Sequence, residues 1–199
     1  NAGYRNGIKS TDDCIIVSGT LNITSTEDGI IGKDLCGIVA GDININAGSD
    51  GIKSTYDTDT TKGNVIIEGG NITIKASNDG IQAENILVIN DGTINIKTNN
   101  GAADTTQTHT DNMYMDRGGF GFNNNKTTTT TDDTVESRKG IKAGNMLIIN
   151  DGDITIDSDD DSVHCNSEIY IYGGTINAAT GDDGVHADDL LTVNGGTIN

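Results

Sequence analysis

The chain of 199 residues has no proline, no tryptophan and only two phenylalanines. Basic residues are also scarce, because 12 Lys and Arg stand against 30 Asp and Glu and give a net charge of −18 at pH 7. This charge repels phosphate and excludes a nucleic-acid binder that works through a basic surface. No apolar run approaches the roughly 20 residues of a membrane-spanning helix. With 33% hydrophobic residues, a conventional globular core would be thin.

A repeat of 22 residues offers another way to build a core. A glycine followed by Ile or Val and a second, separate glycine both recur at steps of 22, 22, 29, 60, 22 and 22 residues. The first marker lies at Gly7, Gly29, Gly51, Gly80, Gly140, Ser162 and Gly184, and the second lies at Gly19, Gly41, Gly70, Gly92, Gly152, Gly174 and Gly196. The two longer steps indicate a short insertion near residues 55–62 and a long one at 101–138, within a single domain that spans residues 1–199.

Apolar residues alternate with period two on both sides of the second glycine, which is typical of strands. Cys14 and Ile16 precede Gly19, for example, and Leu21 and Ile23 follow it. A third short apolar stretch follows the first marker in each repeat. Three strands in 22 residues leave no room for a helix, so we expect an all-β, right-handed parallel β-helix of seven rungs. Equivalent residues of neighbouring rungs should lie about 4.8 Å apart, so that each sequence column becomes a column in space.

Two sequence columns before the first marker are acidic. They contain Asp28, Asp50, Asp79, Asp161 and Asp183 directly before the marker, and Asp160 and Asp182 one residue earlier. Carboxylates stacked about 4.8 Å apart repel by about 1 kcal/mol per pair in water and about 3 to 4 kcal/mol at an effective dielectric near 20. Oxygen ligands at turns favour Ca²⁺, and we expect these residues to bind it. The alternative is a solvated acidic edge, and at Arg138 and Lys139 internal ion pairs could replace a metal.

A mostly basic or polar column follows two residues after the first marker. It consists of Lys9, Lys53, Gln82, Lys142, His164 and His186, with Ile31 as the apolar exception. Beside a calcium-loaded acidic column, it would suit a linear anionic ligand that runs along the solenoid. These side chains could equally serve to neutralise the aspartates next to them.

Two further features have a structural interpretation. Cys14 and Cys36 occupy the same inward position on neighbouring rungs, so either a disulfide or two stacked thiols fits. An outward column is unusually apolar and contains Ile15, Ile66, Val88, Ile148 and Tyr170. We expect the 101–138 insertion, which holds both phenylalanines, to cover this column or to contact a partner.

The motifs Asp-Asp-Gly-Val-His-Ala-Asp at 182–188 and Asn-Gly-Gly-Thr-Ile-Asn at 194–199, with Glu-Asp-Gly-Ile at 27–30, resemble a secreted clostridial-type carbohydrate-binding β-helix family. The resemblance covers the seven rungs but not the long insertion. It implies a pectate-lyase-like fold, bound calcium, an extracellular location and binding to cellulose or acidic plant cell-wall polysaccharides such as polygalacturonate.

These observations favour a non-catalytic module that binds acidic polysaccharide. A polysaccharide lyase is the less favoured alternative, in which Ca²⁺ acidifies a proton beside a uronate carboxylate and Lys53 or Lys142 removes it. A third hypothesis is a filament, because Asn1 would continue the repeat after Asn199 and neither end shows a cap. Head-to-tail stacking of copies would then satisfy both strand edges.

Overall fold

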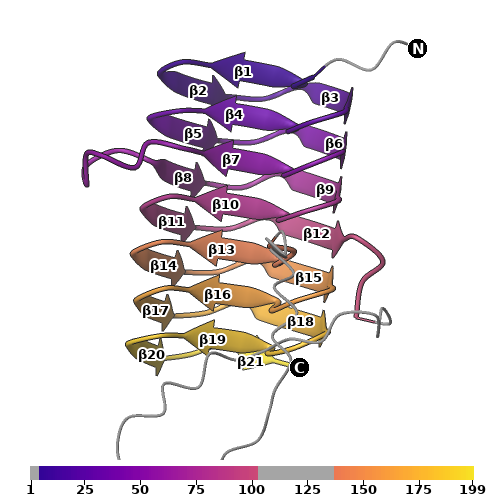
Figure 1. The fold of residues 1–199 in the computed structure, drawn as a ribbon. Helices are drawn as coiled ribbons and strands as arrows, with labels where there is room; N and C mark the ends of the chain where they lie inside the picture. Colours follow the sequence, from indigo (N-terminus) through magenta and orange to yellow (C-terminus); the bar gives the residue numbers. More distant parts are fainter. Residues whose placement is uncertain (1–4, 103–136) are drawn as a thin grey trace, which may run out of the picture.

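The computed structural model describes residues 5–102 and 137–199, which coil into a stack of strands (Figure 1). The described residues form three parallel sheets of seven strands each, and the chain visits the sheets in turn. This topology confirms the all-β fold and the parallel β-helix of seven rungs with three short strands per rung. The described residues contain no helical segment with the length and apolar character needed to cross a bilayer.

Each sheet is built from one strand of every rung. Sheet 1 consists of β1 (Ile8–Ser10), β4 (Ile30–Gly32), β7 (Ile52–Ser54), β10 (Ile81–Ala83), β13 (Ile141–Ala143), β16 (Val163–Cys165) and β19 (Val185–Ala187). Sheet 2 consists of β2 (Asp13–Ile16), β5 (Leu35–Ile38), β8 (Asn64–Ile67), β11 (Ile86–Ile89), β14 (Met146–Ile149), β17 (Glu168–Ile171) and β20 (Leu190–Val193). Sheet 3 consists of β3 (Thr20–Ser25), β6 (Asp42–Ala47), β9 (Asn71–Ala76), β12 (Thr93–Thr98), β15 (Asp153–Ser158), β18 (Thr175–Thr180) and β21 (Thr197–Ile198).

The pairing register follows the sequence repeat. Ile8 pairs with Ile30 in sheet 1, and Cys14 pairs with Cys36 in sheet 2. The register also continues across both insertions, since Lys53 pairs with Gln82 and Gln82 pairs with Lys142. Residues that share a sequence column therefore stack in space, as the repeat predicts.

The core is a set of ladders of inward-facing aliphatic side chains. Ile52, Ile81 and Ile141 stack along sheet 1 and have no exposed surface. Alternation along most strands places every second residue inside, as in β9, where buried and exposed residues alternate over all six positions. Stacked isoleucines fill the narrow interior without large aromatic residues.

The two glycine columns serve different purposes. All seven glycines of the second marker have positive φ, for example 123° at Gly41 and 127° at Gly92, a conformation that favours glycine. None of the described glycines of the first marker has positive φ. Glycine is needed at these positions because there is no space for a side chain. A Cβ on Gly80, for example, would lie 2.4 Å from Ile96 Cγ2 and 2.5 Å from the carbonyl oxygen of Gly140.

Cys14 and Cys36 are both free and buried. Of the two possibilities that the sequence leaves open, the structure therefore has the stacked thiols. In the outward column of sheet 2, Ile15 is 54% exposed, and Ile66, Val88 and Ile148 are partly buried. Most of the insertion expected to cover this column, residues 103–136, lies outside the described part of the chain.

Candidate functional site

The acidic column forms a hydrogen-bonded ladder at the turn that enters sheet 1. At four of these turns, one carboxylate oxygen accepts the backbone N–H of the equivalent residue in the next rung; the carboxylates are those of Asp28, Asp50, Asp79 and Asp161. Asp28 Oδ1 lies 3.2 Å from the nitrogen of Asp50, and Asp50 Oδ1 lies 3.0 Å from that of Asp79. Asp79 Oδ1 accepts from Lys139 at 2.8 Å. These N–H groups hold one oxygen of each carboxylate in place between rungs.

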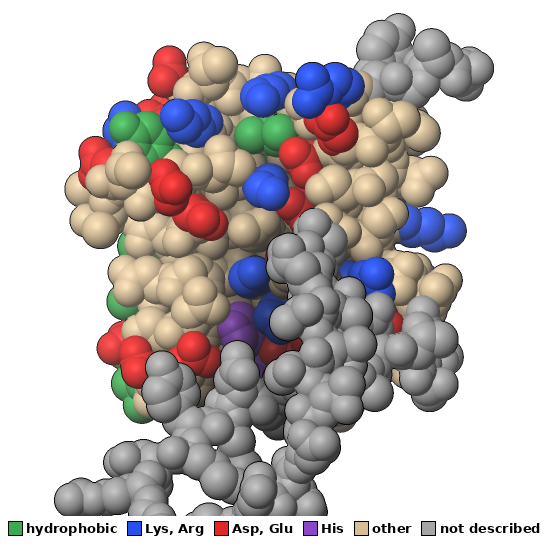
Figure 2. All heavy atoms as spheres, in the orientation of Figure 1, with side chains coloured by type: hydrophobic (Ala, Val, Ile, Leu, Met, Phe, Trp, Pro, Cys, Tyr) green, Lys and Arg blue, Asp and Glu red, His purple; other side chains and the backbone are tan. Residues whose placement is uncertain are grey.

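The basic column lies three residues after the acidic one, on the central residue of each strand of sheet 1. The short strands bring the two columns together, so that lysine and histidine side chains bend back to the aspartates. Figure 2 shows Lys and Arg (blue), Asp and Glu (red) and His (purple) side chains close together on one face of the solenoid. Lys53 Nζ lies 2.5 Å from Asp50 Oδ2, and Lys142 Nζ lies 3.8 Å from Asp79 Oδ2. At these two positions the lysines therefore neutralise the neighbouring aspartates, which is one of the two roles that the sequence leaves open for this column.

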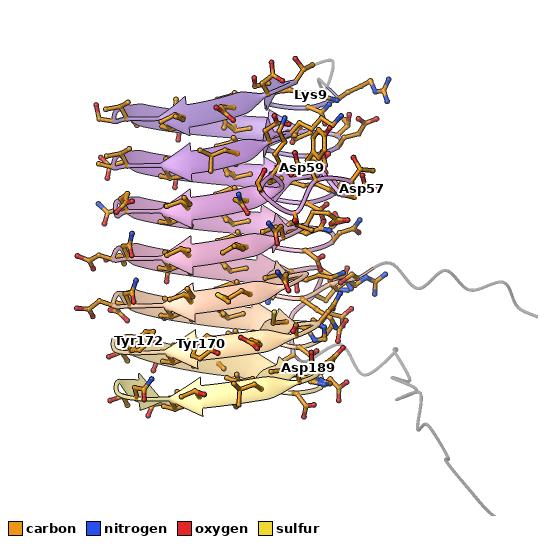
Figure 3. All side chains as sticks on the ribbon, turned by 90° about the vertical axis from the view of Figure 1, so that its left-hand side faces the viewer. Lys9, Asp57, Asp59, Tyr170, Tyr172 and Asp189 are labelled. Carbon is orange, nitrogen blue, oxygen red and sulfur yellow. The ribbon has the colours of Figure 1, made fainter. Side chains whose placement is uncertain are left out.

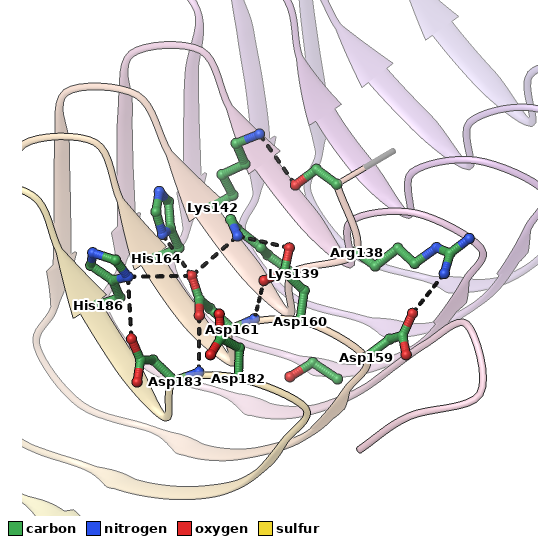
Figure 4. Close-up of polar contacts among 12 residues, drawn as sticks. Arg138, Lys139, Lys142, Asp159, Asp160, Asp161, His164, Asp182, Asp183 and His186 are labelled. Atoms are coloured by element: carbon green, nitrogen blue, oxygen red, sulfur yellow. Dashed lines mark hydrogen bonds and ion pairs between the residues drawn. The ribbon is translucent and has the colours of Figure 1, made fainter. Parts of the chain in front are cut away.

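Rung five replaces the acidic doublet with Arg138 and Lys139, and both pair with carboxylates of rung six (Figure 4). Lys139 Nζ lies 2.8 Å from Asp160 Oδ2 and 3.1 Å from Asp161 Oδ2. Arg138 Nη1 lies 2.8 Å from Asp159 Oδ2, whose side chain is fully buried. Internal ion pairs thus take up the charge at this rung, as the sequence predicts.

The environment shifts the pKa values of the ladder carboxyls in opposite directions. Burial raises the pKa of Asp50 and Asp79 above the ordinary value, although Lys53 and Lys142 act against this effect. For Asp161, burial also acts to raise the pKa, but the hydrogen bond with His164 and the charge of Lys139 outweigh it and hold the pKa well below the ordinary value. Of these three carboxyls, Asp161 is the one whose anion the folded chain stabilises.

The substitution Asp79→Asn is expected to leave the chain at least as stable at pH 7, whereas Asp79→Ala is expected to lower the free energy of unfolding by about 1–3 kcal/mol. An asparagine oxygen can still accept the Lys139 N–H, as Asn6 Oδ1 accepts the Asp28 N–H at 3.3 Å in the first rung. Asparagine also avoids the burial of a charge. Urea unfolding of the three chains measures the difference.

The sign of the pH dependence follows from the raised pKa of Asp79. Ionisation of this carboxyl costs stability as pH rises above the unfolded value of about 3.9. The advantage of Asn over Asp is thus expected at pH 7 and should vanish below about pH 4, where the carboxyl is protonated in both states. A parent chain that is clearly more stable than Asp79→Asn at pH 7 would contradict this expectation.

A polar groove of about 240 Å³ runs along these columns over rungs three to five. It is lined by Ser49, Asp50, Lys53, Asn78, Asp79, Gln82, Ser137 and Lys142. Three predicted ligand-binding residues and two predicted metal-binding residues thus line one groove. Its lysines and aspartates balance in formal charge, and its hydroxyl and amide groups can donate and accept hydrogen bonds.

Within residues 5–102 and 137–199, two clusters of side chains could hold a metal ion. One consists of Asp160, Asp161 and Asp182, and the other of Asp161, His164 and His186, with one ligand atom of each residue within 4.8 Å of the others. Three carboxylates are oxygen donors of the kind that calcium takes, so the first cluster fits this ion in donor type. Lys139 lies against two of these carboxylates and supplies a positive charge there.

The remaining predicted residues lie toward the two ends of the columns. Lys9 is exposed in the first rung, and Ile31, its neighbour in the column, is buried. Asp28 Oδ1 accepts a backbone N–H, and Asp183 Oδ2 lies 3.4 Å from His186 Nδ1. The ligand and metal roles of the predicted residues stay predictions.

Sequence reasoning did not single out two features. The first is Asp159, the partner of Arg138, which lies one residue outside the two acidic columns. The only sequence signal for this ion pair was the opposite charge of Arg138, 21 residues before Asp159. Tyr170 and Tyr172 lie side by side at β17, with ring centroids 6.4 Å apart and planes 10° apart (Figure 3). Two aromatic residues at positions i and i+2 of an outward strand face were the available signal.

Comparison with known proteins gives one match. Residues 1–184 match a family described as carbohydrate-binding domain-containing protein. Neither the curated proteins nor the solved structures contain a match to the chain. Since the family match spans nearly the whole chain and includes the groove, the protein belongs to the family of carbohydrate-binding domain-containing proteins.

Proposed function

We propose that the protein is an extracellular, non-catalytic module that binds acidic polysaccharide along its acidic and basic columns. The groove over rungs three to five carries this proposal, because it combines hydroxyl, amide, carboxylate and ammonium groups in one row. Sugar hydroxyls and carboxylates hydrogen-bond to such groups. An acidic polysaccharide of the plant cell wall lies outside cells, and the proposed location follows from this ligand.

The proposal includes calcium because of the charge balance. The net charge of −18 repels a polyanion, and Lys53 is already paired with Asp50. Uronate carboxylates therefore meet no excess of positive charge in the groove. Calcium, when bound, supplies a divalent charge that protein and sugar oxygens can share. Asp160, Asp161 and Asp182, which lie one and two rungs beyond the groove on the same columns, are the residues that would hold it for a sugar chain that extends past the groove.

Binding of polygalacturonate is expected to require calcium and to weaken about two- to tenfold in Gln82→Ala. Gln82 lines the groove and carries no charge, so its removal costs about one hydrogen bond to the sugar without disturbing the ion pairs. Binding can be measured on immobilised polygalacturonate in calcium, in magnesium and in a chelator.

Tyr172→Ala is the matched control, because Tyr172 follows β17 in sheet 2 and does not line the groove. It should bind polygalacturonate like the parent chain. Equal binding in calcium and in chelator would contradict the calcium part of the proposal. A loss in Tyr172→Ala together with parent-like binding of Gln82→Ala would move the sugar to the face of sheet 2.

Lyase activity receives no support from Lys53. Burial acts to lower the pKa of its amine, but Asp50 outweighs this effect and raises the pKa above the ordinary value. Lys53 is therefore protonated at neutral pH and cannot accept a proton from a uronate. The other candidate base, Lys142, also has polar partners within the protein. Its Nζ lies 3.3 Å from Ser137 Oγ and 3.8 Å from Asp79 Oδ2.

Head-to-tail assembly into a filament stays a prediction. Within the described residues, the strands of the first and last rungs pair on one side only, and Leu191, Val193 and Ile198 of the last rung are more than 40% exposed. Such edges accept further parallel strands.

A further inference from the structure

The basic column changes its chemistry in the last two rungs. Lysine or glutamine fills it in rungs three to five, whereas rungs six and seven carry His164 and His186, which pair in register. Each histidine ends a repeated motif, Asp-Ser-Val-His at 161–164 and Asp-Gly-Val-His at 183–186. Stacking of the two motifs brings two carboxylates and two imidazoles together (Figure 4).

Three of these side chains, those of Asp161, His164 and His186, each place a ligand atom within 4.8 Å of the others. His164 Nδ1 lies 2.8 Å from Asp161 Oδ2, and His186 Nδ1 lies 3.7 Å from the same oxygen. His186 Nδ1 is also 3.4 Å from Asp183 Oδ2. Four ligand atoms around a tetrahedral Zn²⁺, at bonds of about 2.0–2.2 Å, lie about 3.3–3.6 Å from one another. The three contacts given above, at 2.8 to 3.7 Å, are near this range. Asp161, His164 and His186 can therefore approach one ion, and Asp183, which adjoins His186, would turn toward it as the fourth ligand.

The second nitrogen of each ring lies near a side-chain oxygen. His164 Nε2 lies 2.9 Å from Asn166 Oδ1, and His186 Nε2 lies 3.4 Å from Asp188 Oδ1. In the metal-free chain, His164 Nδ1–H can donate to Asp161 Oδ2; with a metal on Nδ1, the ring proton would lie on Nε2 and be donated to Asn166 Oδ1. This is the outer-shell arrangement that orients histidine ligands in metal sites.

We propose that Asp161, His164, Asp183 and His186 form a binding site for a divalent transition metal of the zinc type. Imidazole nitrogen favours such ions over calcium, which takes oxygen ligands. The ammonium of a lysine in the same column cannot coordinate a metal, so the site is confined to rungs six and seven. Asp161 and His164 are buried, while the side chains of His186 and Asp183 are 37% and 60% exposed, and an ion can enter from that side.

The test is a titration of tag-free, chelator-treated protein with Zn²⁺ by calorimetry and with Co²⁺ by visible absorption, in the presence and absence of millimolar calcium. One ion per chain is expected, and the cobalt complex should have the absorption bands of a low-coordinate nitrogen and oxygen site. His186→Gln should weaken zinc binding by more than the roughly 10–100-fold of an outer-shell change. Its partly exposed position makes this variant compatible with folding, and circular dichroism checks the fold.

Two matched controls separate this site from other metal ligands of the chain. His109→Gln removes the third histidine, which lies outside the described residues, and Lys142→Gln changes the same column one rung earlier. Both should bind zinc like the parent. Zinc binding that is unchanged in His186→Gln, or absent from the parent chain, would overturn the proposal. Neither result bears on polygalacturonate binding, which is measured separately.

Discussion

Replacing Lys139 with methionine is expected to lower the free energy of unfolding by about 3–5 kcal/mol at pH 7. The ammonium of Lys139 lies within 3.1 Å of oxygens of both Asp160 and Asp161, and the Asp161 side chain is only 3% exposed. Methionine fills a similar volume but leaves two neighbouring carboxylates without this cation. Urea unfolding in a chelator-containing buffer measures the loss.

Calcium is expected to restore part of the stability of Lys139→Met and to stabilise the parent less. Without the ammonium, Asp160, Asp161 and Asp182 form a cluster of carboxylates that calcium can neutralise. A ligand that binds only the folded chain raises its stability in proportion to the logarithm of its concentration. Melting temperatures across a calcium series should therefore rise more steeply in the variant.

The effect of Lys139→Met also depends on pH. The pKa of Asp161 is lowered in the folded chain, so the stability that this carboxylate contributes is present above its unfolded pKa of about 3.9 and is lost as pH falls below it. The difference between parent and variant should therefore shrink below about pH 4. Lys97→Met is the control, because its pair with Asp157 is about 40% exposed and contributes at most about 1 kcal/mol. A Lys139→Met loss no larger than that of Lys97→Met would contradict the prediction.

The second large effect is expected at Gly80. Gly80→Ser should lower the free energy of unfolding by about 1–3 kcal/mol or more, because its Cβ would meet Ile96 Cγ2 at 2.4 Å and a backbone oxygen at 2.5 Å. Rung six already contains the matching exchange, with Ser162 in the glycine column and Ala178 in the column of Ile96. At the rung of Ser162, the hydrogen bond from Val163 N to the carbonyl oxygen of Gly184 is 3.2 Å long. The equivalent hydrogen bond at the rung of Gly80, from Ile81 N to the carbonyl oxygen of Gly140, is 3.0 Å long.

The double variant Gly80→Ser/Ile96→Ala tests this coupling. Ile96→Ala alone should cost about 2–5 kcal/mol through the cavity that it leaves. The double variant should lose about 0.5–3 kcal/mol less than the sum of the two single losses, because the serine occupies part of that cavity. Gly69→Ser is the control, since a Cβ there would meet nothing closer than 3.7 Å. Strict additivity of the two changes would show that the backbone oxygen, and not Ile96, excludes the side chain.

Much of the fold could be predicted because a β-helix converts sequence period into position. The 22-residue spacing of Ile8 and Ile30 or of Cys14 and Cys36 already specifies their pairing, and period-two alternation specifies which side chains are inside. The same logic places Asp161 beside Asp183 and His164 beside His186. Columns of like residues, and therefore the acidic ladder, follow from the sequence alone.

The direction of the polar side chains depends on the tertiary structure. Whether Lys53 reaches outward to a ligand or back to Asp50 depends on the path of the turn before β7 and on the N–H groups that hold the aspartate, neither of which a spacing encodes. The same holds for the first glycine column, where the close approach of Ile96 and the next rung, and not a positive φ, excludes a side chain. Sequence determined which residues stack, because the repeat sets the register. Contact between neighbouring columns was decided by the folded backbone, because the distances between columns depend on the shape of the turns.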